Sequence, residues 1–312
     1  MTTLSPATKR YSFRIPGQGE RPRVFLPEID LHVHSTASDG IHHPRELVRM
    51  AKRLRLAAIS ITDHDTVAGV DEAISVGSEL GVEVVPGIEI GSYFQGRSIH
   101  VLGYFIDPEN EALVEFIRSK RSARHARAAE MVRRLGADGL PITMDEVLKV
   151  AQGGTLGRVH IARVLIKHGV VATVTDGFNR FLKRGTPYYV PMLKPSPLEA
   201  VAVIRKAGGI ASLAHPVFIR EHLLQEILPL LSNAGLGAIE ALSGFDAEYG
   251  LSVEEHLLRC SMMGGIATDY QLARSGGSDF HGLSVKPQEM GSAHVPMSFL
   301  DELRAKRQGT AV

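Results

Sequence analysis

Residues 29–40 read Ile29-Asp30-Leu31-His32-Val33-His34-Ser35-Thr36-Ala37-Ser38-Asp39-Gly40, and this stretch decides the fold. Apolar and polar residues alternate along it, which predicts a β-strand with His32 and His34 on one face. Two histidines about 7 Å apart on one face can bind a common metal ion. The polar run that closes with Asp39-Gly40 predicts a loop that folds a carboxylate back over the same site. Taken alone, the stretch fits a surface strand with two solvated histidines equally well, so the rest of the chain must supply the support.

The composition is that of an ordinary globular protein. The chain has 312 residues, of which 44% are hydrophobic and 22% are charged, and its net charge is +1. This length suits one large α/β domain or a barrel with an insertion. The near-zero charge gives no electrostatic case for nucleic acid or an acidic membrane, although it leaves room for a local basic face. The single cysteine, Cys260, excludes an internal disulfide and a cysteine-based zinc site, and we expect it to be a buried apolar residue.

The lengths of the apolar stretches in the sequence indicate the cellular compartment. None approaches the ~18 residues of a membrane span. Residues 1–23 lack the apolar core of a signal peptide and are expected to form a flexible N-terminal extension. We therefore expect a cytoplasmic protein.

A short apolar run that ends in polar residues and is followed by a helical stretch recurs along the chain. The predicted strands are 29–34, 57–61, 82–85, 98–105, 208–213, 237–242 and 272–275. The predicted helices between them are 44–56, 67–80, 197–207, 223–234 and 248–263. Strands that alternate with helices imply a parallel sheet, and seven of them suggest a closed or nearly closed barrel. The functional residues of such a barrel lie at the carboxyl ends of its strands.

The alternation breaks between residues 107 and 189, where helices are predicted over 111–135, 144–151, 158–168 and 176–184. No strand here ends in a histidine or a carboxylate. We interpret 107–189 as an inserted helical subdomain, 24–106 with 190–298 as the barrel domain, and 299–312 as a C-terminal helix or tail.

Six histidines and three carboxylates lie at the predicted strand ends: His32, His34, Asp39, His64, Glu89, His100, His215, Asp279 and His281. Nine ligands exceed the needs of one ion, so they predict two or three divalent ions about 3.5–4 Å apart. Nitrogen and oxygen ligands favour Zn, Mn or Fe over Ca. Asp63 is expected to orient the ring of His64. His42 and His43, in the first loop, are expected to be solvated.

Five motifs carry a resemblance to a known family: His32-Val33-His34 with Asp39-Gly40, Thr62-Asp63-His64-Asp65, Pro86-Gly87-Ile88-Glu89, Ala214-His215-Pro216 and Ser278-Asp279-Phe280-His281-Gly282. They resemble the PHP family, which is named for polymerase and histidinol phosphatase, over residues 24–106 and 190–298. The resemblance implies a distorted seven-stranded (β/α) barrel with a trinuclear metal site. Carried over by motif, the first ion would be held by His32, His34, Glu89 and Asp279. The second would be held by Glu89, His100 and His215, and the third by Asp39, His64 and His281.

The helical insertion, with Gly157-Arg158-Val159-His160-Ile161-Ala162, resembles one branch of this family. That branch dephosphorylates 3′,5′-bisphosphate nucleotides and trims short RNA from its 5′ end. Its usual Gly-Arg-Pro-His is Gly-Arg-Val-His here, a departure that bears on loop stiffness more than on charge. Arg158, His160 and Lys183 are the candidate substrate-binding residues. Arg158 and Lys183 are candidates for a second phosphate, unless both are solvated surface charges.

The expected reaction is hydrolysis of a phosphomonoester or a terminal phosphodiester by a hydroxide that bridges two ions. Manganese is the expected metal, with zinc or iron as alternatives. Asp65 is the candidate acid for the leaving oxygen, and a helix N-cap is its alternative role. The expected partner is a phosphorylated nucleotide or a short oligonucleotide, with no membrane and no obligate protein partner. Three other readings stay open: another phosphatase of the family, such as histidinol phosphatase; a metal-dependent amidohydrolase; and a non-catalytic metal-binding module.

Overall fold

The computed structural model describes residues 28–246, 249–283, 285–286 and 288–310, so the expected extension over residues 1–23 lies outside it. The chain begins with β1 (Ile29–Val33), α1 (Pro44–Arg53), β2 (Ala58–Ile61), α2 (Val70–Leu80), β3 (Glu83–Phe94) and β4 (Arg97–Tyr104). It continues with α3 (Glu111–Ala137), α4 (Met144–Ala151), α5 (Arg158–Lys167), α6 (Val174–Gly177) and the π-helix η1 (Phe178–Leu182). It ends with α7 (Pro197–Lys206), β5 (Ile210–Leu213), the 3₁₀ helix η2 (Pro216–Phe218), α8 (Glu221–Asn233), β6 (Ala238–Ser243), α9 (Val253–Asp269), β7 (Ala273–Gly277) and α10 (Met297–Thr310).

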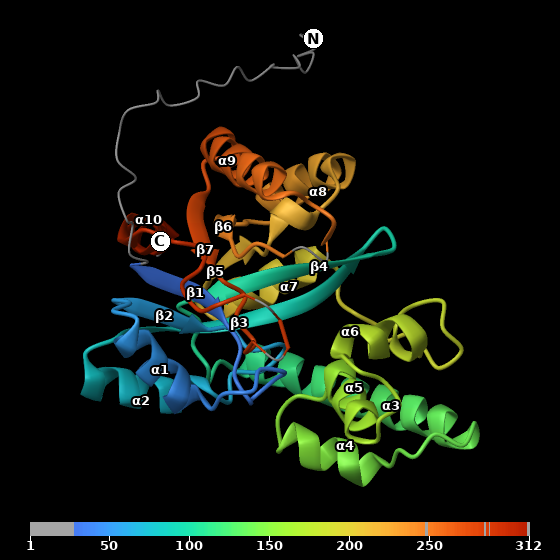
Figure 1. Cartoon of the computed structure of the whole chain (residues 1–312). Coiled ribbons are helices and arrows are strands. Elements are labelled where there is room, and N and C mark those ends of the chain that lie inside the picture. The colour runs from blue at the N-terminus through green and yellow to red at the C-terminus, as the bar shows by residue number, and fades with distance from the viewer. Residues whose placement is uncertain (1–27, 247–248, 284, 287, 311–312) are drawn as a thin grey trace, which may run out of the picture.

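The seven strands form one sheet in the order β1 to β7, curled into a nearly closed barrel (Figure 1). The residues after β7 approach β1, where the His34 N–H donates to the Phe280 carbonyl at 2.9 Å. The predicted barrel is confirmed, but the prediction of a wholly parallel sheet is wrong. β4 runs antiparallel to both β3 and β5. The two residues Gln95 and Gly96 between β3 and β4 both have positive φ, which suits a hairpin turn, whereas a parallel crossover needs a dozen residues or more.

β3 is longer than predicted and changes its partner half-way. It pairs with β2 as far as Pro86 and with β4 from Gly87 onward. A side chain at Gly87 would collide with the Ser60 hydroxyl, since an added Cβ would lie 2.3 Å from that oxygen. The expected strand end at 85 is therefore wrong. Glu89 lies within β3 and His100 lies within β4, rather than at strand ends.

Side-chain caps explain several helix starts. In α4, α7 and α9 a Ser or Thr caps the first turn while a Glu three residues later bonds back to the cap, as in the Ser252–Glu255 pair of α9. α9 therefore starts at Val253, after the predicted start, and residue 248 lies outside the described residues. α2 starts at Val70, not at 67, and the helix predicted over 176–184 is divided between α6 and η1.

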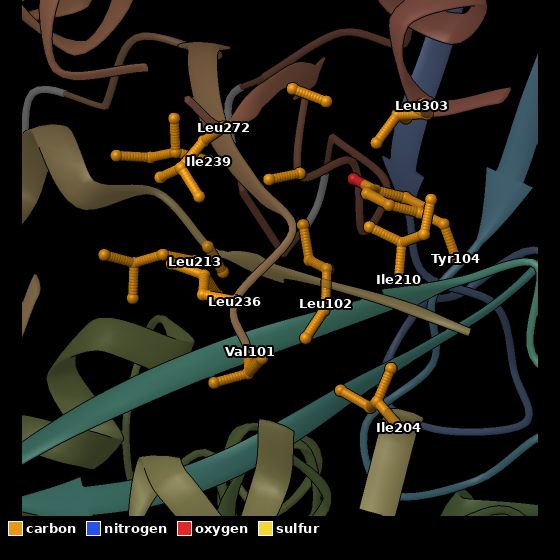
Figure 2. Close-up of a cluster of buried hydrophobic side chains, with 14 of the residues drawn as sticks. Val101, Leu102, Tyr104, Ile204, Ile210, Leu213, Leu236, Ile239, Leu272 and Leu303 are labelled. Atoms are coloured by element: carbon orange, nitrogen blue, oxygen red, sulfur yellow. The ribbon is translucent and has the colours of Figure 1, made fainter. Parts of the chain in front are cut away.

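Helices cover the barrel on its outer side. α1 and α2 lie side by side against β1 and β2, and α8 and α9 lie on the opposite side of the barrel (Figure 1). Figure 2 shows part of the main core, where Leu102 and Tyr104 of β4 pack near Ile210 of β5 and Ile239 of β6. Cys260 is buried there, as expected. Across the described ranges, no helix is long and apolar enough to cross a membrane.

The helices α3 to α6 extend away from the barrel (Figure 1). They pack around a hydrophobic cluster of their own, which includes Met131 and Leu135 of α3 and Val164 and Leu165 of α5. This cluster supports the division of the chain into a barrel and an inserted subdomain at 107–189, which stays a prediction.

Candidate metal centre

The structure brings the nine residues expected to bind metal to one end of the barrel. Each approaches at least one of the others with a nitrogen or oxygen atom within 4.8 Å. His32 projects from β1 and His34 follows directly after that strand, while Glu89 projects from β3 and His100 from β4. The others lie on the segments that follow β1, β2, β5 and β7: Asp39, His64, His215, Asp279 and His281. His32, His34 and Glu89 are almost fully buried, so the centre lies inside the barrel mouth and not on its rim.

Three clusters of ligand atoms can be distinguished. The first contains His32, His34, Glu89 and Asp279, the same four residues that the family resemblance implies for one ion. The second contains Glu89, His100 and His64, and the third contains Asp39, His64, His281 and His34. His215 was expected in the second cluster and lies beside it, with Nε2 3.2 Å from Glu89 Oε1. Glu89 belongs to two of the clusters, so its two oxygens can serve two ions.

Several nitrogen and oxygen atoms of these residues are free to bind metal ions. His32 Nε2, both ring nitrogens of His34, His64 Nδ1 and Glu89 Oε2 are buried without a hydrogen-bond partner. An unpaired buried polar atom costs about 1–3 kcal/mol, so five of them at one point need an explanation. Each belongs to a residue of a ligand cluster, and coordination would satisfy all but one of them, since a neutral imidazole such as His34 binds an ion through a single nitrogen. Imidazole and carboxylate ligands suit Zn, Mn or Fe.

Glu240 of β6 contacts two of the candidate ligands, His32 and His215, and the sequence analysis missed it. Its side chain is fully buried. Oε1 lies 3.0 Å from His32 Nδ1, and Oε2 accepts the backbone N–H of His215. A carboxylate on the far nitrogen fixes the ring orientation of a metal-binding histidine. A lone acidic residue inside the apolar run Ala238–Leu242 was the signal that could have revealed it.

Asp30 and Asp63 fix the two loops that carry the remaining carboxylates. Asp30 accepts bonds from the backbone and hydroxyl of Ser278 at 2.9 and 2.6 Å, just before Asp279. Asp63 accepts bonds from the Ser35 backbone at 2.8 Å and from the Ser35 and Ser38 hydroxyls. Burial raises the pKa of both carboxyls, although these bonds oppose the rise. The expectation that Asp63 orients His64 is not borne out, because its bonds go to the first loop.

The surroundings of Asp65 match neither of its two expected roles, the acid for the leaving oxygen and the helix N-cap. It is buried, and its Oδ2 accepts from Arg124 Nε at 2.8 Å while Oδ1 accepts from the Gly91 N–H at 3.2 Å. Burial alone would raise its pKa, but the charge of Arg124 prevails and lowers it. The N-cap alternative is wrong, because Gly69 caps α2. The ion pair also counts against the acid role, which stays a prediction, since it favours the ionised carboxylate.

Four cations gather beside the metal centre: Arg124 and Arg127 of α3, Arg158 at the start of α5, and Lys194. We call them the cation cluster. Burial lowers the pKa of Arg158 to about 10, and its neighbour Arg127 adds to the effect. Burial, and then Arg124, lowers the pKa of Lys194 to about 8. Lys194 donates to the Ser98 hydroxyl at 2.8 Å, and that oxygen lies 3.1 Å from His100 Nε2. One hydroxyl therefore separates the cation cluster from a ligand of the metal centre.

Comparisons with known proteins agree with this geometry. The PHP domain model matches residues 30–140. The "5'-3' exoribonuclease" of Haemophilus influenzae is 32% identical over 81% of this chain and 90% of its own length. The "3',5'-nucleoside bisphosphate phosphatase" of Chromobacterium violaceum is 30% identical over 81% of this chain and 90% of its own. A solved structure from Bifidobacterium adolescentis, described as a metal-dependent phosphoesterase, superposes with a TM-score of 0.79 at 34% identity and covers 89% of this chain and 96% of that one.

The chain belongs to the PHP family. It is a metal-dependent phosphoesterase, and its barrel is of the PHP type. The ligand clusters consist of histidines and carboxylates that could hold metal ions. The non-catalytic alternative therefore gives way to the phosphoesterase interpretation.

The three residues expected to bind the substrate of this PHP enzyme differ in their surroundings. Arg158 is half-buried, donates to the Leu182 carbonyl at 2.9 Å and stacks on the Phe178 ring. It is therefore no solvated surface charge. His160 is buried, its Nδ1 accepts the Gly157 N–H at 3.0 Å, and burial lowers its pKa to about 4, so it serves the start of α5. Lys183 is exposed and donates to Asn179 at 3.0 Å.

His42 and His43 lie outside the three ligand clusters. His42 stacks on Phe280 at 5.7 Å between ring centres, and His43 caps α1 and bonds Thr36 Oγ1 at 3.1 Å. Both therefore have local structural contacts, and the structure gives neither a role in binding metal.

Proposed function

We propose that this phosphoesterase removes the 3′-phosphate of 3′,5′-bisphosphate nucleotides and trims short RNA from its 5′ end. The names of two relatives, a 5'-3' exoribonuclease and a 3',5'-nucleoside bisphosphate phosphatase, support this proposal. The observation that carries the proposal is the cation cluster beside the metal centre. A substrate with a single phosphate would occupy the metal centre alone. A nucleotide with two phosphates, or the first nucleotide of a 5′-phosphorylated RNA, has a second anion for the cation cluster.

The charge balance of the cation cluster supports a bound anion. Asp65 is the carboxylate that faces it, and this carboxylate is paired with Arg124. Burial, and then repulsion by the neighbouring cations, lowers the pKa values of Arg158 and Lys194. A phosphate would relieve this repulsion, and a guanidinium can bind it through two parallel N–H bonds.

The roles of the residues in the reaction follow from their positions. Bound divalent ions lower the pKa of water and neutralise charge on the reacting phosphoryl group. Glu89, shared between two ligand clusters, fixes their spacing, and Glu240 holds the ring of His32. Arg124 and Arg158 hold the phosphate that does not react and so orient the one that does.

We infer two or three divalent ions per chain, with manganese first and zinc or iron as alternatives, because nine nitrogen and oxygen ligands converge. The partner is then a phosphorylated nucleotide or a short oligonucleotide. The proposal needs no protein partner and no membrane, and it assigns the enzyme to the cytoplasm, where such substrates occur.

The test compares two substrates in the presence of manganese. Arg158→Ala should lower kcat/KM for adenosine 3′,5′-bisphosphate by about 1.5–3 kcal/mol, the range for charged hydrogen bonds. Hydrolysis of p-nitrophenyl phosphate should hardly change, because this substrate lacks a second phosphate. Arg180→Ala is the matched control, since Arg180 also stacks on a phenylalanine of the insertion but is exposed.

Equal loss on both substrates would assign Arg158 to the fold or the metal centre instead. No loss on either would remove the physical support for the second phosphate. Lys183→Ala in the same assay decides whether the exposed lysine contributes. If the enzyme hydrolysed histidinol phosphate better than the bisphosphate, the alternative of a histidinol phosphatase would be favoured.

A further inference from the structure

A cavity of about 800 Å³ lies between the loop after β1 and the inserted helices, apart from the cation cluster. Thr36, Gly40 and Ile41 line it on the barrel side, while α4, α5 and residues 172–174 line it on the other. Its volume lies within the usual range for ligand pockets. None of the nine metal ligands lines it, so it is a separate feature of the molecule.

Two backbone contacts place this cavity next to the metal centre. Arg163 of α5 lines the cavity, and its Nη2 donates to the carbonyl of Asp39 at 2.6 Å. The Thr155 N–H donates to the Ala37 carbonyl at 2.8 Å. The loop that carries the metal ligand Asp39 therefore forms the boundary between the cavity and the third ligand cluster.

The charge of the cavity lining favours an anion. Three cations line it: Lys149, Arg163 and Lys167. The one carboxylate in the lining, Glu146, is already bonded to the Thr143 backbone and to His168 Nε2, at 3.1 and 2.8 Å. Apolar side chains complete the lining: Ile41, Val150, Ile166 and Val174. Cations suit the phosphates of a nucleic-acid backbone, and an apolar wall can pack against the flat face of a base.

Helix α5 separates the cavity from the cation cluster. Arg158, its first residue, lines a narrow hollow together with Arg124 and Arg127 of α3. Arg163, five residues later, lines the cavity. Since five residues turn an α-helix by about 140°, the two arginines point from different faces of α5. Cationic side chains therefore line a hollow on each side of the helix.

We propose that the cavity binds the RNA segment on the 3′ side of the phosphate being cleaved. This inference rests on the proposed function and extends it. With the 5′ nucleotide in the cation cluster and the reacting phosphate at the metal centre, the rest of the RNA must leave the centre on another side. The cavity lies directly across the Asp39 loop from the metal centre, and it offers lysines for the backbone phosphates and apolar side chains for the bases. A bisphosphate nucleotide has no segment that would reach it.

The experiment uses the full chain loaded with manganese and the double variant Lys149→Ala with Lys167→Ala. Both lysines are exposed, so their removal should leave the fold intact. For a 5′-phosphorylated tetranucleotide RNA, kcat/KM should fall about tenfold at low salt. For adenosine 3′,5′-bisphosphate it should stay within about twofold. Lys52→Ala with Lys206→Ala is the matched control, because it removes two exposed lysines that do not line the cavity.

The salt dependence gives a second measurement. Each phosphate contact on a single strand adds a slope of about 0.7 to log K against log salt. Removing two contacts should therefore reduce the loss of kcat/KM between 50 and 200 mM salt by about sevenfold for the tetranucleotide. If the lysines only supported the fold, the double variant would lose kcat/KM on both substrates, and the slope against log salt would stay unchanged.

The outcomes separate the two hypotheses. An unchanged slope and unchanged RNA cleavage in the double variant would overturn the cavity assignment, while wild-type cleavage of both substrates would keep the proposed function. Equal loss on both substrates would also overturn the assignment. A wild-type enzyme that hydrolyses the bisphosphate but no RNA would refute the cavity assignment and the RNA part of the function. A wild-type enzyme that hydrolyses neither would refute the proposed function itself.

Discussion

Glu240→Gln should weaken metal binding although Glu240 touches no metal ion. Both oxygens of this buried carboxylate accept a bond: Oε1 faces His32 Nδ1 at 3.0 Å, and Oε2 accepts the His215 N–H. Glutamine keeps the shape but replaces one acceptor by an NH₂ donor. One of the two N–H groups must then face another donor, and the His32 ring or the His215 backbone must turn away.

The magnitude follows from two independent arguments. A buried donor left without an acceptor costs about 1–3 kcal/mol. Removing the partner of a metal-binding histidine usually lowers metal affinity about 10- to 100-fold, which is about 1.4–2.7 kcal/mol. The two ranges overlap. We therefore expect the affinity for manganese in the cluster that contains His32 to fall by that factor.

Calorimetric titration of the metal-free protein with manganese measures the effect. Glu302→Gln is the matched control, because both oxygens of Glu302 also accept bonds, from Arg274, but Glu302 lies on α10 and not at the metal centre. Thermal unfolding in the presence of a chelator separates a loss of fold stability from a loss of metal binding. An unchanged manganese affinity in Glu240→Gln would refute the idea that this carboxylate orients His32.

Three further predictions concern the reaction. Glu89→Gln should lower turnover of p-nitrophenyl phosphate by more than roughly a hundredfold, because a neutral amide bridges two cations poorly. His43→Ala should change this turnover little. Comparable losses in the two variants would show that the first loop is wrongly assigned. Lys194 has a pKa of about 8, below its ordinary value, so its charge is present below that pH and lost above it. KM for the bisphosphate should therefore rise as the pH passes about 8, and Lys194→Arg should remove this rise; a rise that persists in the variant assigns it to another group. Asp65→Asn should impair the bisphosphate and p-nitrophenyl phosphate differently: an acid is dispensable for the good nitrophenolate leaving group, so an equal loss on both substrates would contradict the acid role.

Most candidate metal ligands could be chosen from the sequence because they are polar residues at or just after the end of an apolar run, whereas Glu89 and His100 lie within strands. His215 follows the apolar run of β5, and Asp279 follows the run of β7. Their neighbours in the sequence supply the strands, and a barrel brings the ends of its strands together. Glu240 carried a comparable signal, but it lies inside a strand. A search confined to strand ends therefore passed over it.

Of the cation cluster only Arg158 was predicted from the sequence, because the cluster depends on how the insertion docks on the barrel. Arg124 lies on α3, and Lys194 lies 70 positions further along the chain, before α7. Arginines occur along much of the α3 sequence, so no single face of that helix is marked for a ligand. The partner of Arg124 is Asp65, on the loop after β2, and no local pattern connects the two.

β3 shows why the ligands were easier to predict than the topology. Parallel strands would have placed Glu89 and His100 at two separate strand ends that meet at the barrel mouth. In the structure they belong to the hairpin of β3 and β4, where Gly91 pairs with His100, two residues beyond Glu89. Glu89 Oε1 lies 2.8 Å from His100 Nδ1 across this hairpin. The same two ligands meet by a different route, because the change of partner at Gly87 turns the second half of β3 toward β4. The need for both ligands at one centre is thus compatible with either strand direction, and the two-residue turn after Phe94 is what decides between them.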